Sequence, residues 1–275
     1  MLRPDVPLDV EALRRGRTTA CFGAVIRYLE TTDSTNTVAQ QLARDGAVEG
    51  TVVIAETQTR GRGRLGRSWA SPAFRNLYLS IVLHPPVAVP DAPRLGLVVG
   101  LATAETVAEW TPRAALKWPN DVLIDGRKVA GILMEMDAEE DRVRSVIAGI
   151  GVNLNMTPED LPDDLRGKAG SLRMALGTPI DRVAFAGRLL ARLEARYTQC
   201  LQEGFAALRG AWERLSCLTG RAVEIDDGGR RFHGTVCALA DDGTLQLRDT
   251  AGRMISVVAG EVTVIDGYGK ERADS

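Results

Sequence analysis

Residues 58–69, Gln-Thr-Arg-Gly-Arg-Gly-Arg-Leu-Gly-Arg-Ser-Trp, set four arginines among three glycines. Glycines let backbone N–H groups approach an anion without a Cβ in the way, and guanidinium groups form bidentate, charge-assisted hydrogen bonds with phosphate or carboxylate. The apolar run at residues 51–55, directly before them, is typical of a buried strand. The pattern predicts a mobile cationic loop that closes over a nucleotide or an acyl phosphate.

This loop has two other interpretations. Residues 61–66 satisfy G-x-G-x-x-G, but a dinucleotide fingerprint needs an apolar helix directly after the glycines and an acidic residue about twenty positions on. Here Ser71-Pro72 and a second strand follow, and Pro85-Pro86 stand near the acidic position, which argues against NAD binding. A solvated surface loop is the other alternative. Trp69 weakens it, because a tryptophan beside a cationic loop can stack on an adenine.

Residues 117–121, Lys-Trp-Pro-Asn-Asp, place a cation, an aromatic ring, a rigid turn residue, an amide and a carboxylate at a strand end. A lysine there can neutralise a carboxylate and an α-phosphate that are brought together. Asp121 could hold Mg²⁺, with phosphate oxygens and waters completing the shell. The alternative is that Asn120 and Asp121 only form the turn and Lys117 only pairs with a nearby acid.

Two further segments are weaker signals. Residues 31–36, Thr-Thr-Asp-Ser-Thr-Asn, precede apolar positions at helical spacing, so they either line a site or simply cap that helix. Residues 149–155, Gly-Ile-Gly-Val-Asn-Leu-Asn, end a strand with two glycines that allow close ligand approach. Asn153 offers both a donor and an acceptor to an adenine edge.

The elements that position these motifs follow from apolar periodicity and turn signals. Asp125-Gly126 between two apolar runs predicts a hairpin. Strands joined by hairpins favour an α+β fold with a mixed, mainly antiparallel sheet and packed helices. Short strands every eight to twelve residues after Gly220 predict a small β-barrel. We expect strands at 25–29, 51–55, 76–83 and 144–149, and helices at 7–15, 94–110, 181–203 and 205–215.

Composition narrows the class of protein. The chain has 275 residues, 45% hydrophobic and 25% charged, with a net charge of −2. The sequence contains no run of about 18 apolar residues, so no membrane span is predicted. The N-terminus lacks the pattern of a signal peptide, so we expect a cytoplasmic protein. The net charge argues against nonspecific nucleic-acid binding. The four cysteines lack the spacing of zinc or dithiol sites and are expected to be small buried residues.

Together these motifs resemble the ordered signature of the biotin protein ligases. The resemblance covers residues 25–265 and is carried by Asp33-Ser-Thr-Asn36, Gln58 with Gly61-Arg-Gly-Arg64, Lys117-Trp-Pro-Asn-Asp121, Lys128-Val-Ala-Gly-Ile-Leu133 and Gly149-Ile-Gly-Val-Asn153. It implies a catalytic domain related to class II aminoacyl-tRNA synthetases and lipoate ligases, followed by an SH3-like barrel. We assign these domains to residues 1–217 and 218–270.

The resemblance implies two reactions at one site. Biotin and Mg-ATP form biotinyl-5'-AMP and pyrophosphate, and a lysine of a biotin carboxyl carrier domain then takes the biotinyl group. The implied catalytic residues are Lys117, Arg62, Asp121 and Lys128, with Asp121 as the Mg²⁺ ligand. The implied binding residues are Ser34, Thr35, Asn36, Gln58, Gly61, Gly63, Arg64, Arg67, Trp69, Asn120, Gly131 and Asn153.

By the same resemblance, Ser34, Thr35 and Gln58 hold biotin, whereas Trp69 and Asn153 meet the adenine. Longer members of the family carry a DNA-binding domain before the catalytic one. No such module is recognised in the sequence, so no DNA binding is expected. Many members have an arginine four residues after the glutamate of the Gly-Glu-Val motif at residues 260–262, where this chain has Ile265. A homodimer is a further expectation from the family.

Two rival functions stay open at this point. A lipoate or octanoate ligase of the same fold would need an extended apolar slot rather than Gln58 with the Gly-Arg-Gly-Arg segment. A non-catalytic RNA-binding or anion-binding protein would use the arginine loop and the barrel, and its binding would weaken with salt. ATP-dependent retention of biotin separates the ligase from that second rival.

Overall fold

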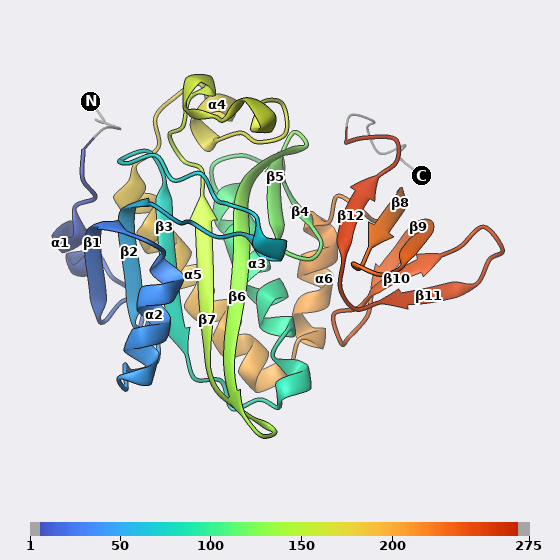
Figure 1. The fold of residues 1–275 in the computed structure, drawn as a ribbon, viewed down its shortest axis with the longest axis horizontal. Coiled ribbons are helices and arrows are strands. Elements are labelled where there is room, and N and C mark those ends of the chain that lie inside the picture. The colour runs from blue at the N-terminus through green and yellow to red at the C-terminus, as the bar shows by residue number, and fades with distance from the viewer. Residues whose placement is uncertain (1–5, 269–275) are drawn as a thin grey trace.

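The computed structural model describes residues 6–268 (Figure 1). Residues 1–5 and 269–275, which include the outer ends of both predicted domains, lie outside the described residues. A seven-stranded sheet has the order β1-β2-β3-β7-β6-β5-β4. Its strands are β1 (Ile26–Thr32), β2 (Val52–Gln58), β3 (Leu77–Leu83), β4 (Ala114–Lys117), β5 (Asp121–Ile124), β6 (Arg127–Glu139) and β7 (Arg142–Val152). Only the β1–β2 pair is parallel, so the predicted mixed, mainly antiparallel sheet is confirmed.

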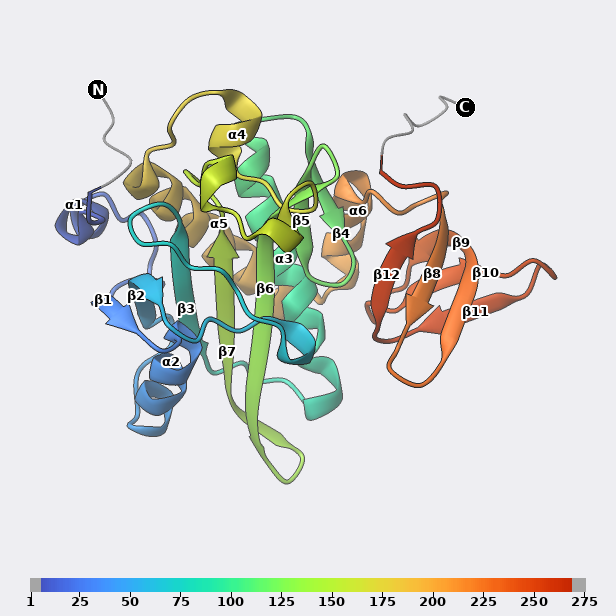
Figure 2. The ribbon, with the colours of Figure 1, turned by 45° about the horizontal axis from the view of Figure 1, so that its top comes forward.

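Helices cover both faces of this sheet. They are α1 (Val10–Arg15), α2 (Thr35–Arg44), α3 (Arg94–Ala108), α4 (Leu172–Leu176), α5 (Arg182–Glu203) and α6 (Ala206–Leu215). Helix α2 lies in front of the sheet and α3 and α5 lie behind it (Figure 1), where α3 is buried along nearly its whole length. On the front face, the segment after β2 crosses β7 and β6 (Figure 2). This crossing segment is the arginine loop, residues 59–70.

The predicted Asp125-Gly126 hairpin is confirmed. Both residues have positive φ, 50° and 74°, which the two central positions of a type I′ turn require. The turn joins β5 to β6 and sets Asp121 opposite Gly131. In the preceding hairpin Lys117 lies opposite Asp121. Two turns thus bring the Lys-Trp-Pro-Asn-Asp segment onto the central sheet.

The C-terminal region forms a second, five-stranded antiparallel sheet of order β11-β10-β9-β8-β12. Its strands are β8 (Ala222–Asp226), β9 (Arg231–Leu239), β10 (Leu245–Arg248), β11 (Met254–Val257) and β12 (Glu261–Val264). This small β-unit agrees with the SH3-like fold expected there. It touches the central sheet through Trp118, whose Nε1 donates to the Gly243 carbonyl at 3.2 Å.

The expectations for the cysteines and for membrane spans can be compared with the structure. The four cysteines are free, as expected, but they are half-buried rather than fully buried. Three of them, Cys21, Cys200 and Cys217, pack against the margin of the apolar core. Between residues 6 and 268 the structure contains no helix that is both long and apolar enough to cross a membrane.

Candidate functional site

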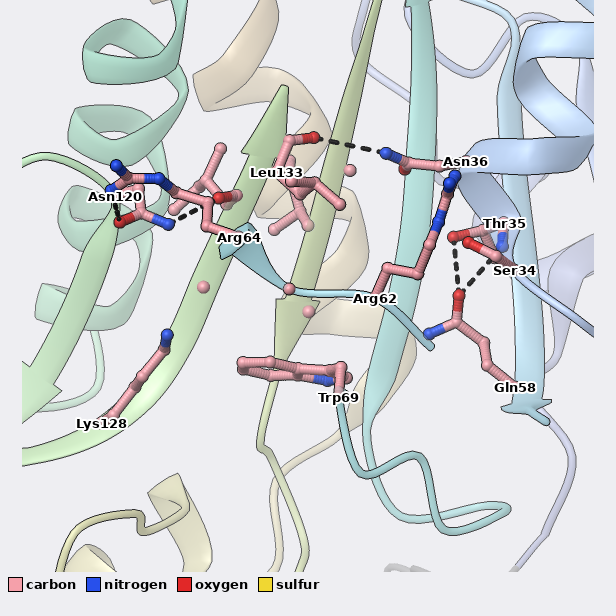
Figure 3. A pocket seen from close by; sticks show the side chains of 16 residues that line it. Ser34, Thr35, Asn36, Gln58, Arg62, Arg64, Trp69, Asn120, Lys128 and Leu133 are labelled. Atoms are coloured by element: carbon pink, nitrogen blue, oxygen red, sulfur yellow. Dashed lines mark hydrogen bonds between the residues drawn. The ribbon is translucent and has the colours of Figure 1, made fainter. Parts of the chain in front are cut away.

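Two cavities lie beneath the arginine loop on the front of the central sheet. The first is small, about 50 Å³, and the second is about 490 Å³. Figure 3 shows Trp69 between the Gln58–Thr35 group and the Arg64–Asn120 pair. Five residues line both cavities, namely Gly63, Arg64, Trp69, Asn120 and Lys128. Two cavities with a common wall can hold two ligands, or two parts of one ligand, in contact.

Hydrogen bonds between side chains build the first cavity. Gln58, at the end of β2, accepts from the backbone N–H of Thr35 at 2.9 Å and lies 3.2 Å from the Thr35 hydroxyl. Its Nε2 donates to Ser71 Oγ at 3.2 Å. Ser80 on β3 places its hydroxyl 2.8 Å from Thr35 Oγ1 and 2.6 Å from Asn36 Oδ1. The network fixes the orientation of each amide that faces the cavity.

Asn36 connects this network to the loop. Its side chain is 3% exposed and donates to Glu135 Oε2 at 2.6 Å, and the same carboxylate oxygen accepts from Arg62 at 2.9 Å. The amide fits against the sheet only because Gly149 has no side chain: a Cβ there would lie 2.1 Å from Asn36 Oδ1. Gly149 therefore lines the cavity and makes room for Asn36, while the close ligand approach expected from its motif stays a prediction.

Residues 34–36 begin helix α2 and also line the first cavity. Asp33 Oδ1 accepts a hydrogen bond from the Ser34 N–H at 2.6 Å. Ser34 is the N-cap residue of α2, but its side chain makes no capping hydrogen bond. The Thr35 hydroxyl lies in the network around Gln58 instead. Ser34, Thr35 and Asn36 all line the first cavity and are almost completely buried.

Trp69 forms the wall between the cavities. Its indole lies over two glycines of neighbouring strands, since a Cβ on Gly151 would come within 2.6 Å of the ring and one on Gly131 within 2.9 Å. Lys128 Nζ lies 5.4 Å from the ring centroid, a cation–π distance. The indole N–H is buried and has no hydrogen-bond partner in the described structure. The tryptophan is held by packing, with its N–H turned towards Gly151 of the sheet.

The arginine loop lies at the surface, with Arg60, Arg62 and Arg67 exposed, but its arginines are paired. Arg62 pairs with Glu135 on β6 and Arg64 donates to Asn120 Oδ1 at 2.9 Å. Arg67 forms an ion pair with Glu261 on β12. The loop therefore joins the central sheet to the C-terminal unit and covers both cavities.

The second cavity brings together the charged residues of the Lys-Trp-Pro-Asn-Asp and Lys128 motifs. Asp121 Oδ1 lies 2.6 Å from Lys128 Nζ, and Lys117 lies across the hairpin from Asp121. Burial lowers the pKa of Lys117 below its ordinary value of 10.5, and Asp121 partly offsets this. Burial likewise lowers the pKa of Arg64, against the field of Asp121. These cations are kept partly dehydrated, which strengthens their attraction to an anion.

Asn153 lines the second cavity but differs from its expected role. It is 5% exposed, its Nδ2 donates to the Gly170 carbonyl at 2.9 Å, and its Oδ1 lies 3.5 Å from Asn76 Nδ2. The amide therefore fixes the backbone of the segment around Gly170 and is not a free reader of an adenine edge. Among residues 6–268, no group of three or more His, Cys, Asp or Glu side chains is arranged to hold a metal ion.

Four contributors were missed by the sequence reasoning. They are Ser80, Glu135, Glu261 and Tyr268. The period of two in a strand could have identified Glu135, because it shares a face of β6 with Gly131 and Leu133, both of which line the first cavity. Glu261 belongs to the Gly-Glu-Val motif of residues 260–262, but its pairing with Arg67 depends on how the C-terminal unit docks. Tyr268 carries no local signal, because its place beside the second cavity depends on the same docking.

Comparisons with known proteins agree with this geometry. Residues 28–153 match the model of the Biotin/lipoate A/B protein ligase family. The chain is 38% identical over 273 residues to a Biotin--[acetyl-CoA-carboxylase] ligase of Mycobacterium tuberculosis, covering 95% of this chain and 96% of the relative. It is 37% identical over 246 residues to the Bifunctional ligase/repressor BirA of Bacillus subtilis, covering 89% of this chain and 76% of the relative.

A solved structure leads to the same family. The biotin protein ligase from Aquifex aeolicus, in complex with biotin and ATP, superimposes with a TM-score of 0.75 at 29% identity, over 87% of this chain and 97% of that one. The fold, the ordered motifs and the relatives agree, and the chain belongs to the biotin/lipoate A/B protein ligase family, among its biotin protein ligases.

Proposed function

We propose that this protein activates biotin with ATP to form biotinyl-5'-AMP and transfers the biotinyl group to a lysine of a biotin carboxyl carrier domain. The observation that carries the proposal is the pair of cavities that meet at Trp69 and share Arg64 and Lys128. Adenylation joins a carboxylate to an α-phosphate, so it needs two binding sites with cations where they meet. The relatives named as biotin ligases support biotin as the acid.

The first cavity is the proposed biotin site. A ureido group offers two N–H donors and one carbonyl acceptor, which match the hydroxyl and amide groups of Ser34, Thr35 and Gln58. Gly61 and Gly63 keep the loop backbone close to the cavity. The cavity volume of about 50 Å³ is below the usual ligand-site range of roughly 300 to 1,000 Å³, so the loop must open to admit biotin.

The second cavity is the proposed nucleotide site. Trp69 and apolar residues such as Met156 and Leu161 suit the adenine, while Arg67, Lys117 and Lys128 suit phosphates. Asn120 orients Arg64 at the wall between the sites. We assign Asn153 a supporting role, in which it shapes the cavity through the Gly170 carbonyl.

In the reaction, Lys117 and Arg64 would hold the biotin carboxylate against the α-phosphate and stabilise the charge of the transition state. Arg62 would keep the loop closed through Glu135, so that water does not hydrolyse the mixed anhydride. Asp121 fits a Mg²⁺ site that takes one protein carboxylate and several phosphate oxygens, with Lys128 beside it. A bound Mg²⁺ would supply charge neutralisation on the phosphates.

We also propose a domain boundary, a cellular location and an oligomeric state for the chain. We place the boundary between a catalytic domain, residues 1–217, and a C-terminal domain, 218–270, in the segment that joins α6 to β8. We further propose a cytoplasmic protein that forms a homodimer and does not bind DNA. Sedimentation at several protein concentrations tests the dimer, and fluorescence anisotropy with duplex DNA tests the last point.

One experiment tests the function directly. The chain is incubated with radiolabelled biotin, Mg-ATP and a carboxyl carrier domain, and the label on the carrier is counted. We expect labelling that needs ATP and the acceptor lysine, with octanoate and lipoate failing to compete. Labelling with octanoate or lipoate in place of biotin would indicate the rival acyl ligase. Salt-sensitive RNA binding without ATP consumption would indicate the non-catalytic protein.

A further inference from the structure

The segment after β12 returns to the catalytic hairpin. Tyr268 packs on the turn between β5 and β6, where a Cβ on Gly126 would lie 2.6 Å from the Tyr268 Cβ. Lys117 Nζ lies 5.7 Å from the centroid of the tyrosine ring. Tyr268 also lines the second cavity together with Asp121 and Lys128. A residue from the C-terminal unit thus contributes to the wall of the proposed nucleotide site.

The hydroxyl of this tyrosine is unsatisfied. It is buried and has no hydrogen-bond partner among residues 6–268. Burial raises the pKa of Tyr268 above its ordinary value of 10.0, so the group stays neutral and can donate a proton to a hydrogen bond. A buried polar group without a partner is costly and unusual in a folded protein, and it calls for a ligand that completes it.

The neighbours of Tyr268 indicate which part of a ligand that is. Lys117, next to its ring, is a half-buried cation, and Lys128 lies in the same cavity. Cations beside a neutral O–H donor form a site for a phosphate, whose oxygens accept hydrogen bonds and carry negative charge. Tyr268 does not line the first cavity, so biotin is not its partner.

We propose that the Tyr268 hydroxyl donates a hydrogen bond to a β- or γ-phosphate oxygen of ATP, because the α-phosphate is assigned to Lys117 and Arg64 and Tyr268 stands outside the first cavity. The inference rests on the proposed function, because it takes the second cavity as the ATP site. It also gives the C-terminal unit a role where the arginine expected from the family is absent. Ile265 occupies that position, is 59% exposed and does not line the cavity. Tyr268, three residues later, reaches it.

The test compares Tyr268→Phe with wild type in the two half-reactions. The variant keeps the ring beside Lys117 and loses only the hydroxyl. We expect the KM for ATP in biotin-dependent ATP–pyrophosphate exchange to rise about tenfold, as for the loss of one hydrogen bond to a charged group, with the KM for biotin unchanged. Transfer from preformed biotinyl-5'-AMP to the carrier should keep its wild-type rate, because the adenylate has no β- or γ-phosphate.

A binding measurement separates this inference from the proposed function. Calorimetry with Mg²⁺ and a non-hydrolysable ATP analogue should show about tenfold weaker binding to Tyr268→Phe, with AMP binding unchanged. If wild type bound the analogue in this tyrosine-dependent way but exchanged no pyrophosphate, the proposed function would fail and the contact would stand.

The matched control is Tyr197→Phe, which loses a buried hydroxyl from α5 in a residue that lines neither cavity, and its ATP KM should not change. Equal analogue affinity of Tyr268→Phe and wild type would overturn the contact. An equal loss of AMP binding, or of transfer from the adenylate, would also overturn it, because Tyr268 would then shape the whole cavity rather than contact the terminal phosphates.

Discussion

The two cavities on either side of Trp69 are built in different ways. The first is lined by amides and hydroxyls that hydrogen-bond to each other, with Gln58, Thr35, Ser80 and Asn36 in one connected network. The second combines apolar side chains such as Met156 and Leu161 with charged groups, among which Lys117 is partly dehydrated. Neutral hydrogen bonds select a ligand by shape and donor pattern, whereas buried cations act on charge as it develops.

The two cavities are also formed by different segments of the chain. The network of the first cavity comes from the central sheet and α2, within residues 34–151. The second cavity also needs residues 156–169 and the segment 260–268 of the C-terminal unit. We therefore expect changes in the first cavity to alter biotin affinity, and changes in the second to alter the rate and the use of ATP.

The largest expected effect is that of Lys117→Ala. Loss of a cation that stabilises the transition state typically costs about 3 kcal/mol, or roughly a hundredfold in rate. Pre-steady-state pyrophosphate release should therefore slow by about that factor, while the Kd for biotin stays within about twofold. A parallel loss of rate and biotin affinity would show that the two cavities are not functionally separate. Unchanged pyrophosphate release would refute the assignment of Lys117.

The next effect is expected from Gly149→Ala. The added Cβ would lie 2.1 Å from Asn36 Oδ1, so Asn36 must leave its place between Ser80 and Glu135. We expect biotin to bind about tenfold more weakly, as for the loss of one or two hydrogen bonds, with the affinity for AMP unchanged. Calorimetry with each ligand measures this.

Gly187→Ala is the matched control for that variant. It adds the same methyl group within α5, where the nearest atom would be Leu13 Cδ1 at 3.8 Å. Alanine favours a helix over glycine by about 1 kcal/mol, so this variant should melt at the same or a higher temperature and bind biotin normally. Weaker AMP binding by Gly149→Ala would contradict the separation of the two sites.

A smaller and graded effect is expected from pH. Lys117 acts as an ammonium, and burial lowers its pKa below 10.5, so it loses its proton at a lower pH than an exposed lysine. As pH rises through that pKa, kcat/KM for ATP should fall, since this ratio reports the free enzyme. Biotin affinity should not follow, because the amides and hydroxyls that we assign to biotin do not titrate. In Lys117→Arg, any remaining activity should lack the alkaline decline.

Features that depend on nearby residues could be predicted from the sequence, whereas contacts between distant segments could not. The Asp125-Gly126 turn and the amphipathic helices follow local rules of period and backbone conformation, and they appear where expected. The strand β6 runs to Glu139, beyond the predicted hairpin, because its pairing with β7 continues past the point where β5 ends. Sequence motifs picked out candidate residues that line the two cavities, but not the hydrogen bonds that most of them make.

Two residues show where local reasoning ends. Asn153 has the chemistry of an adenine reader, yet its amide is used by Gly170, which only the folded chain brings close. Tyr268 has no motif around it and contacts Lys117 across more than a hundred residues. Contacts of this kind depend on tertiary packing, which no local pattern encodes.

The smallest expected difference is one of loop protection, and it separates the two ligands. The arginine loop must open to admit biotin, because the first cavity holds only about 50 Å³, so trypsin should cut within residues 60–67 in the absence of ligands. Arg62 lines the first cavity and Arg67 the second. Biotin alone should therefore slow cleavage after Arg62 more than after Arg67, and biotin with a non-hydrolysable ATP analogue should protect both bonds. Mass spectrometry of the fragments over time measures the two rates. Equal cleavage with and without ligands would mean that the loop does not close over them, and equal protection by biotin at both bonds would mean that it closes as one unit.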